Sequence, residues 1–149
     1  MRLSKQAVGS FAVLGIVLGT SLAVVAADAF QDRHMAMEEI GDAMKALGAM
    51  AKGTTPFKAA AVKSGGTTIA DNLKKAATLF PAGSGGGESR ARPEIWTDAA
   101  GFEKTLKDAQ AAAVALQSVT DEAAFRPALG ALGGNCKACH DKYRLPEKN

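Results

Sequence analysis

Residues that build metal and redox sites are scarce in this chain, which has only 2 cysteines and 2 histidines among 149 residues. A structural zinc site needs four protein ligands, so it would have to recruit all of them, including the distant His34. Strand-like alternation is missing after the N-terminal region, which argues against the βαβ setting of a thioredoxin-type site. Aromatic residues make up 5% of the chain, whereas hydrophobic residues, many of them alanine, reach 47%. This composition favours one soluble helical domain.

The N-terminus has the pattern of an export signal. Arg2 and Lys5 precede an uncharged, apolar stretch at 8–26 that contains many small residues. The small alanines at its end permit cleavage, so residues 1–27 are the predicted signal peptide. An uncleaved anchor is the alternative, because about 20 apolar residues can just span a bilayer. We therefore expect export to the periplasm, with membrane attachment only if the leader is retained.

The excess of positive charge comes mostly from this leader. The whole chain has 18 basic and 15 acidic residues, and removing Arg2 and Lys5 leaves 16 − 15 = +1 for residues 28–149. A nearly neutral domain has no electrostatic footprint for nucleic acid, so nucleic-acid binding is not expected.

The most informative motif is Cys136-Lys137-Ala138-Cys139-His140 near the C-terminus. On a helix the two thiols and the imidazole stand at i, i+3 and i+4, and therefore share one face. C-x-x-C-H is the attachment pattern of c-type haem, in which the thiols bind the porphyrin and the histidine binds iron. Zinc, thiol redox chemistry and a disulfide remain alternatives, although i, i+3 within a helix is poor geometry for a disulfide.

Apolar periodicity predicts four helices, at about 30–51, 56–78, 93–116 and from 120 or 124 onward. Joined mostly by short turns, helices of this length fit an antiparallel four-helix bundle. The glycine-rich segment 81–92 is expected to be a long flexible connection without packed structure. The apolar faces contain Met37, Ile40, Met44, Leu47 and Ala51; Val62, Ile69, Leu73, Ala76 and Phe80; Ile95, Ala99, Phe102, Leu106, Ala109, Ala113 and Leu116; and Phe125, Leu129, Leu132, Cys136, Cys139 and Tyr143.

Local signals refine the helix ends. Thr55 is expected to cap the second helix, and Thr120 the fourth. Two adjacent glycines at 65–66 predict a weak or bent stretch in the second helix. Pro127 predicts either a late start or a kink in the fourth helix.

Together these residues resemble the class II c-type cytochromes, that is, cytochromes c′ and their low-spin relatives. The resemblance covers most of the region after the leader, and it implies an up-down-up-down bundle with haem between the helices. The matching segments, in order, are Arg33-x-x-x-Met37, Ala51-Lys52-Gly53, Leu79-Phe80-Pro81, Pro93-Glu94-Ile95-Trp96 and the C-terminal C-K-A-C-H-D-x-Y-R.

The resemblance implies one covalently attached haem c. Cys136 and Cys139 match the thioether positions, and His140 matches the proximal iron ligand. Arg144 matches an arginine beside the exposed edge of that imidazole, where its charge would keep the histidine neutral. Tyr143 is expected to serve packing, and Trp96 belongs to the predicted core.

The other axial position depends on the first helix. In the low-spin relatives a methionine one turn after an arginine is the sixth iron ligand, whereas in cytochromes c′ a non-coordinating side chain fills that site. Met37 matches the methionine, and Arg33 suits a haem propionate. His34 is a less favoured alternative ligand.

We therefore expect a monohaem cytochrome that carries single electrons through an iron with His140 and Met37 as axial ligands. The alternative is a five-coordinate, high-spin cytochrome c′ that binds NO or CO, and an alternative of another class is a haem-free zinc or thiol protein. No catalytic constellation is seen, so we do not expect an enzyme. Expected partners are redox proteins, small gases in the alternative, and a second copy of the chain, although the glycines at 65–66 count against a homodimer through the first two helices.

Overall fold

The apolar faces that the sequence predicts are buried or half-buried in the bundle, with Ala99 as the exposed exception. The computed structural model describes residues 20–147, so positions 1–19 of the predicted signal peptide lie outside the described residues. The backbone of residues 20–27 already belongs to the first helix. The helices are α1 (Thr20–Ala51), α2 (Ala59–Ala76), α3 (Glu94–Thr97), α4 (Ala99–Leu116) and α5 (Glu122–Tyr143).

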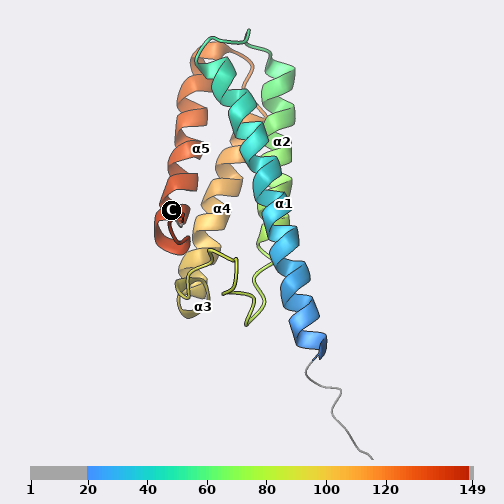
Figure 1. The fold of residues 1–149 in the computed structure, drawn as a ribbon. Coiled ribbons are helices and arrows are strands. Elements are labelled where there is room, and N and C mark those ends of the chain that lie inside the picture. Colours follow the sequence, from blue (N-terminus) through green and yellow to red (C-terminus); the bar gives the residue numbers. More distant parts are fainter. Residues whose placement is uncertain (1–19, 148–149) are drawn as a thin grey trace, which may run out of the picture.

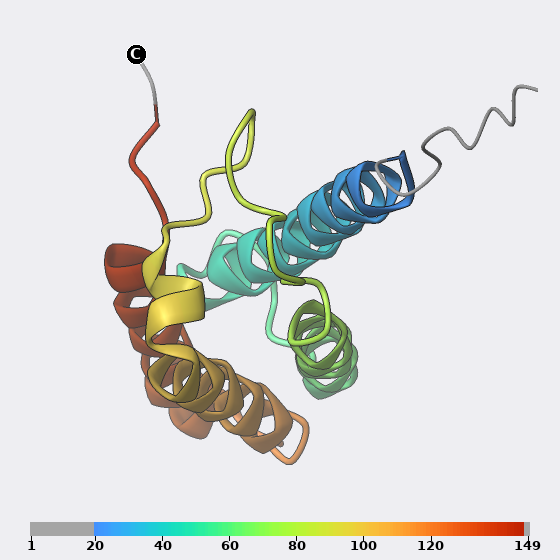
Figure 2. The ribbon, with the colours of Figure 1, turned by 90° about the horizontal axis from the view of Figure 1, so that it is seen from below.

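The four long helices run alternately up and down, and the one-turn α3 lies at the lower end (Figure 1). Contacts join α1 to α2, α2 to α4, α4 to α5 and α5 back to α1, which closes the ring seen along the bundle axis in Figure 2. The predicted all-α, antiparallel four-helix bundle is confirmed. In the described part of the chain no helix is long and apolar enough to cross a membrane.

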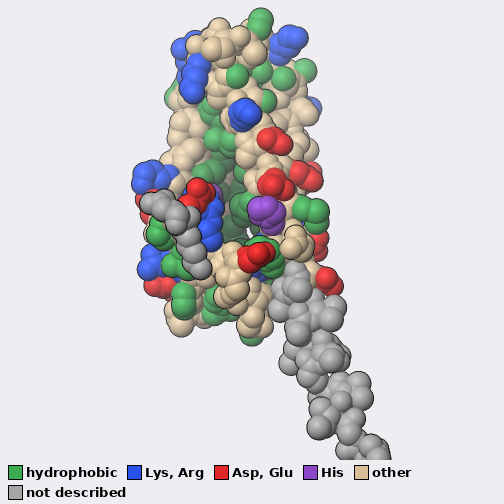
Figure 3. Space-filling model, in the orientation of Figure 1, with side chains coloured by type: hydrophobic (Ala, Val, Ile, Leu, Met, Phe, Trp, Pro, Cys, Tyr) green, Lys and Arg blue, Asp and Glu red, His purple; other side chains and the backbone are tan. Residues whose placement is uncertain are grey.

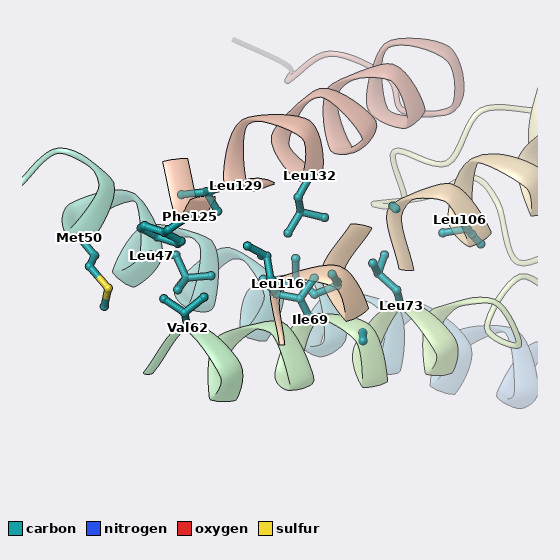
Figure 4. Packing of buried hydrophobic residues seen from close by; sticks show 14 of the residues in the cluster. Leu47, Met50, Val62, Ile69, Leu73, Leu106, Leu116, Phe125, Leu129 and Leu132 are labelled. Carbon is teal, nitrogen blue, oxygen red and sulfur yellow. The ribbon is translucent and has the colours of Figure 1, made fainter. Parts of the chain in front are cut away.

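The core is tightest at the end of the bundle where α1 turns into α2 and α4 into α5. Leu47, Val62 and Phe125 meet there (Figure 4), and the three are at most 2% exposed. Phe57, in the α1–α2 turn, packs on Phe125 with ring centroids 5.6 Å apart. We call this region the closed end.

The adjacent glycines of α2 are contact points between helices, and the helix is not interrupted there. Helix α2 is continuous through both residues. A Cβ on Gly66 would lie 2.8 Å from the carbonyl oxygen of Ala113, and one on Gly65 would lie 3.1 Å from Leu47 Cδ1. Glycine therefore lets α2 approach α4 and α1 closely.

Several predicted helix ends are corrected. Helix α2 begins at Ala59 without a side-chain cap, so Thr55 is not its cap. The predicted third helix is broken at Asp98, whose carboxylate accepts from the backbone N–H of Gly101 and starts α4. Asp121, and not Thr120, caps α5 by accepting from the Ala124 N–H at 2.9 Å.

Helix α5 begins at Glu122 and runs through Pro127 to the motif at its C-terminal end. Of the two alternatives that Pro127 predicts, the late start near residue 124 is therefore not found, and the kink stays a prediction. Proline lacks the N–H for one intrahelical bond, and packing of Phe125 and Leu129 into the core offsets that loss.

Candidate functional site

The half of the bundle opposite the closed end contains a cavity of about 890 Å³. It opens on the face shown in Figure 3, where arginine or lysine, histidine and acidic side chains surround a hollow with hydrophobic walls. Its volume lies in the upper part of the range of about 300–1,000 Å³ that is typical of cofactor pockets. The walls come from all five helices and from the α2–α3 connection. The apolar residues among them include Ile40, Leu73, Phe80, Ile95, Phe102, Leu106 and Ala109.

The C-x-x-C-H motif forms one wall of the cavity. Cys136, Cys139 and His140 all line it and are half-buried, and both cysteines are free thiols. The hydroxyl of Thr105 in α4 donates to Cys139 Sγ at 3.6 Å. Gly133, one turn earlier, also lines the cavity, and a Cβ there would meet nothing within 4 Å. A flat ligand therefore has room beside the α5 backbone.

Burial sets the charge state of these three groups. It raises the pKa of the Cys136 thiol, with the neighbouring Cys139 as a smaller cause, and it also raises the pKa of Cys139. Redox-active thiols have lowered pKa values, so this environment opposes the thiol-redox alternative. Burial likewise lowers the pKa of His140, followed by the positive charges of Arg144 and Arg90. A neutral imidazole is the form that binds a metal.

Helix α1 supplies another wall, with two methionines. Met37 and Met44 both line the cavity and pack partly against the hydrophobic core. Met35 is 48% exposed and does not line the cavity. His34 stands at the mouth, with a 60% exposed side chain and Nε2 3.3 Å from Glu38 Oε1.

Arg33 is buried at the cavity edge, and its guanidinium is turned to the α2–α3 connection. It donates from Nη1 to the carbonyl oxygen of Leu79 at 2.7 Å and to Ser84 Oγ at 3.0 Å. It donates from Nη2 to the carbonyl oxygen of Ser84 at 2.9 Å and to Ser89 Oγ at 3.0 Å. The ring of Phe80 lies 4.7 Å from its Cζ. The predicted absence of packed structure in this connection is therefore wrong, since Ser84 is only 4% exposed.

The base of the cavity is fixed by aromatic contacts. Tyr143 is 2% exposed, stacks edge-on against Phe102 at 5.1 Å and donates its hydroxyl to Asp98 Oδ2 at 2.8 Å. This agrees with its predicted packing role. Trp96 is only half-buried, and its Nε1 donates to the carbonyl oxygens of Phe80 and Pro81.

Sequence reasoning did not find Arg90 or Thr105 as site residues. Arg90 lines the cavity from the glycine-rich connection, where no periodicity places side chains. Thr105 could have been found, because it lies three residues after Phe102 and one before Leu106 in the apolar repeat of α4.

The lining chemistry fits haem c. Two thiols and a neutral imidazole share one wall, the interior is apolar, and Arg33, Arg90 and Arg144 outnumber the single acidic residue, Glu88. Such a charge excess suits a ligand with acid groups at its edge. In the described residues no group of three or more His, Cys, Asp and Glu side chains is placed to hold a metal ion.

Comparisons with known proteins agree with this site. Residues 28–144 match the model of the family described as Cytochrome C′. Cytochrome c′ of Rhodopseudomonas palustris is 40% identical over 131 residues, which cover 87% of this chain and 90% of the relative. Cytochrome c-556 of Agrobacterium fabrum is 43% identical over 125 residues, which cover 83% of this chain and 85% of the relative.

Solved structures show the same fold. Cytochrome c′ from Rhodopseudomonas palustris superposes with a TM-score of 0.77 at 39% identity, covering 81% of this chain and 98% of that one. A nitric oxide complex of a variant of cytochrome c prime from Alcaligenes xylosoxidans superposes with a TM-score of 0.74 at 31% identity, covering 82% of this chain and 97% of that one. The chain therefore belongs to the cytochrome c′ family of class II c-type cytochromes, and it binds one covalently attached haem c.

Proposed function

We propose that Cys136 and Cys139 are the thioether positions for the haem and that His140 is its proximal iron ligand. The observation that carries this proposal is that all three line one cavity of about 890 Å³ with free thiols and an imidazole whose pKa is lowered. Arg144 contributes to that neutral state, because its positive charge disfavours a second charge on the ring.

The main proposal is a five-coordinate, high-spin haem protein that binds a small neutral gas such as NO or CO. A haem iron with one open axial site takes up such a gas, whereas one with both sites filled changes charge by one electron with little rearrangement. The comparisons support the first case better than the electron carrier predicted from sequence, since the solved relatives named above are cytochromes c′ and one is a nitric oxide complex. Most of the residues that line the cavity are apolar, which suits an uncharged gas.

Electron transfer through an iron ligated by His140 and Met37 is the second candidate. One structural observation favours it, because Met37 lines the cavity and is not sealed into the core. In this case Met37 supplies a thioether to the site and excludes gas from it.

The ferrous absorption spectrum of the holoprotein separates the two proposals. A high-spin spectrum that is unchanged in Met37→Leu, together with CO or NO uptake by the wild type, is expected for the main proposal. Sharp low-spin bands that disappear in Met37→Leu would overturn it in favour of electron transfer. Met44→Leu is the matched control, because Met44 lines the same cavity two turns along α1.

Covalent attachment has its own test. Mass spectrometry and a pyridine haemochrome assay on protein matured in a host that assembles c-type cytochromes should show one haem per chain, lost when both cysteines are replaced. Protein without covalent haem would contradict the assignment of Cys136 and Cys139 and would favour the haem-free zinc or thiol alternatives.

The remaining assignments concern the setting of the protein. We propose removal of residues 1–27 on export to the periplasm, where redox proteins or gases are the partners, and no substrate turnover. N-terminal sequencing of periplasmic protein tests the cleavage, and mature protein that still begins with the leader residues would contradict it. Sedimentation of the holoprotein tests for a homodimer.

A further inference from the structure

Arg33 has no N–H group on either terminal nitrogen left for a ligand. A guanidinium carries five N–H donors, of which four belong to Nη1 and Nη2. All four have acceptors in the α2–α3 connection, on Leu79, Ser84 and Ser89. A bidentate bond to a carboxylate uses two parallel donors, so Arg33 would have to release the connection to clamp an acid group.

The α2–α3 connection is attached to the bundle at both of its ends. Arg33 attaches its first part to α1 through the four hydrogen bonds described above. Figure 2 shows it passing from α2 beside α1 and on to α3. At the other end Ala91 forms an isolated β-bridge with Arg144, and the N–H of Leu145 donates to the carbonyl oxygen of Arg90 at 2.8 Å. Glycines with positive φ at 83, 86 and 87 make the turns between these two attachments.

The last part of the connection, residues 88–91, forms part of the cavity wall. Glu88, Ser89, Arg90 and Ala91 all line the cavity. Ser89 takes part in the attachment and in the wall, because its hydroxyl accepts a hydrogen bond from Arg33 and the residue also lines the cavity. Moving Arg33 would therefore move this wall.

We propose that Arg33 is a positioning residue that fixes segment 79–91 as a wall of the haem cavity, and that Arg90, not Arg33, meets a haem acid group. This inference rests on the proposed haem site. Arg33 is 6% exposed and both of its terminal nitrogens are engaged, whereas the Arg90 side chain is 35% exposed and lines the cavity. Within residues 20–147 the ion-pair partner of Arg90 is the 82% exposed Glu147 side chain, at 2.9 Å. An exposed pair of this kind is weak and readily exchanged for another acid.

The first test uses Arg33→Lys in the holoprotein, with hydrogen exchange of the amides of residues 84–91 as the readout. Lysine keeps the charge but has one ammonium in place of the two-nitrogen fork, so several of the four bonds are lost. Exchange should accelerate about tenfold or more, the effect of losing at least one charged hydrogen bond. Unchanged exchange would overturn the proposal.

Two further variants keep this test decisive. Ser89→Ala removes one acceptor without touching Arg33, and it should accelerate the same amides in a folded protein. Arg126→Gln removes a positive charge from an exposed i, i+4 pair with Glu122 and should leave them unchanged. Equal acceleration in Arg126→Gln would mean that general destabilisation, not the loss of these bonds, is being measured, and would count against the proposal.

The second test compares Arg90→Gln with Arg33→Lys through the pH dependence of the reduction potential. Loss of a paired cation should raise the apparent pKa of the haem acid group by about one unit. We expect that shift in Arg90→Gln and not in Arg33→Lys, and the reverse result would overturn the proposal. Covalent haem is measured first by mass, so absence of haem counts against the proposed function, whereas a holoprotein with the reversed pattern counts against this inference alone.

Discussion

The two ends of the bundle differ in what fills the space between the same four helices. At the closed end, protein side chains fill it, and Val62, Leu116 and Phe125 have no exposed surface. At the other end, Met37, Cys136 and His140 are half-buried around a cavity of about 890 Å³. The contrast indicates that the closed end packs on protein atoms alone, whereas the cavity end is completed by the haem.

Removing the haem should have the largest effect on stability, and the loss should be concentrated at the cavity end of the bundle. In Cys136→Ser/Cys139→Ser we expect no covalent haem and the loss of cooperative unfolding, because the cavity walls lose the ligand that they pack on. Amides of α5 near the motif should lose hydrogen-exchange protection before those around Phe125. An apoprotein that unfolds with native-like cooperativity by circular dichroism would contradict the comparison.

Truncating a side chain at each end should give different costs in the holoprotein. Phe125→Ala removes a fully buried ring and should lower the free energy of unfolding by about 3–5 kcal/mol. Met44→Ala, at the partly buried cavity wall, should cost less than about 2 kcal/mol. Denaturant titrations of both variants measure the change in the free energy of unfolding. Equal changes would contradict the proposed difference in packing between the two ends.

A pair of glycine substitutions sharpens the same contrast. Gly66→Ala should destabilise by about 1–3 kcal/mol, because its Cβ would meet the Ala113 carbonyl oxygen at 2.8 Å. Gly133→Ala should instead raise the helical content of the haem-free double-serine variant, since its Cβ meets open space and alanine favours helix. Thermal unfolding of the holoprotein measures the first effect and circular dichroism of the haem-free variant the second, and a lower helical content in Gly133→Ala would show that the wall is already filled.

The smallest effect is a pH dependence at the base of the cavity. Hydrogen bonds from Lys142 and then Tyr143 lower the pKa of Asp98, so its stabilising contribution is present above the ordinary value of 3.8 and is lost as pH falls through the lowered pKa. The bond to Asp98 raises the pKa of Lys142 to about 12, so that contribution is present below 10.5 and is lost as pH rises through about 12. The melting temperatures of wild type and Asp98→Asn should therefore differ at neutral pH and converge at both extremes. A constant difference would rule out this linkage.

Periodicity was a good guide to the faces of the helices and a poor guide to the loops. The apolar repeat of the predicted third helix is buried at Phe102, Leu106 and Leu116, although Ala99 is exposed. The break at Asp98 was missed because an N-cap inside a continuous apolar pattern looks like an ordinary polar position. Composition predicted a loose connection at 81–92, but Arg33 lies far away in sequence and its bonds to Ser84 and Ser89 leave no local signal.

Sequence alone determined that this protein carries a c-type haem on a helical bundle, because C-x-x-C-H is a local pattern whose chemistry needs only one helix face. The family match confirms that prediction. Only the tertiary structure decided which other residues surround that face. It brought Met37 and Arg90 to the cavity and Thr105 to Cys139 from three different segments, and it turned Arg33 toward the connection. The physical reason is that such contacts depend on how helices approach one another. A contact between residues far apart in the chain produces no periodic pattern in the sequence.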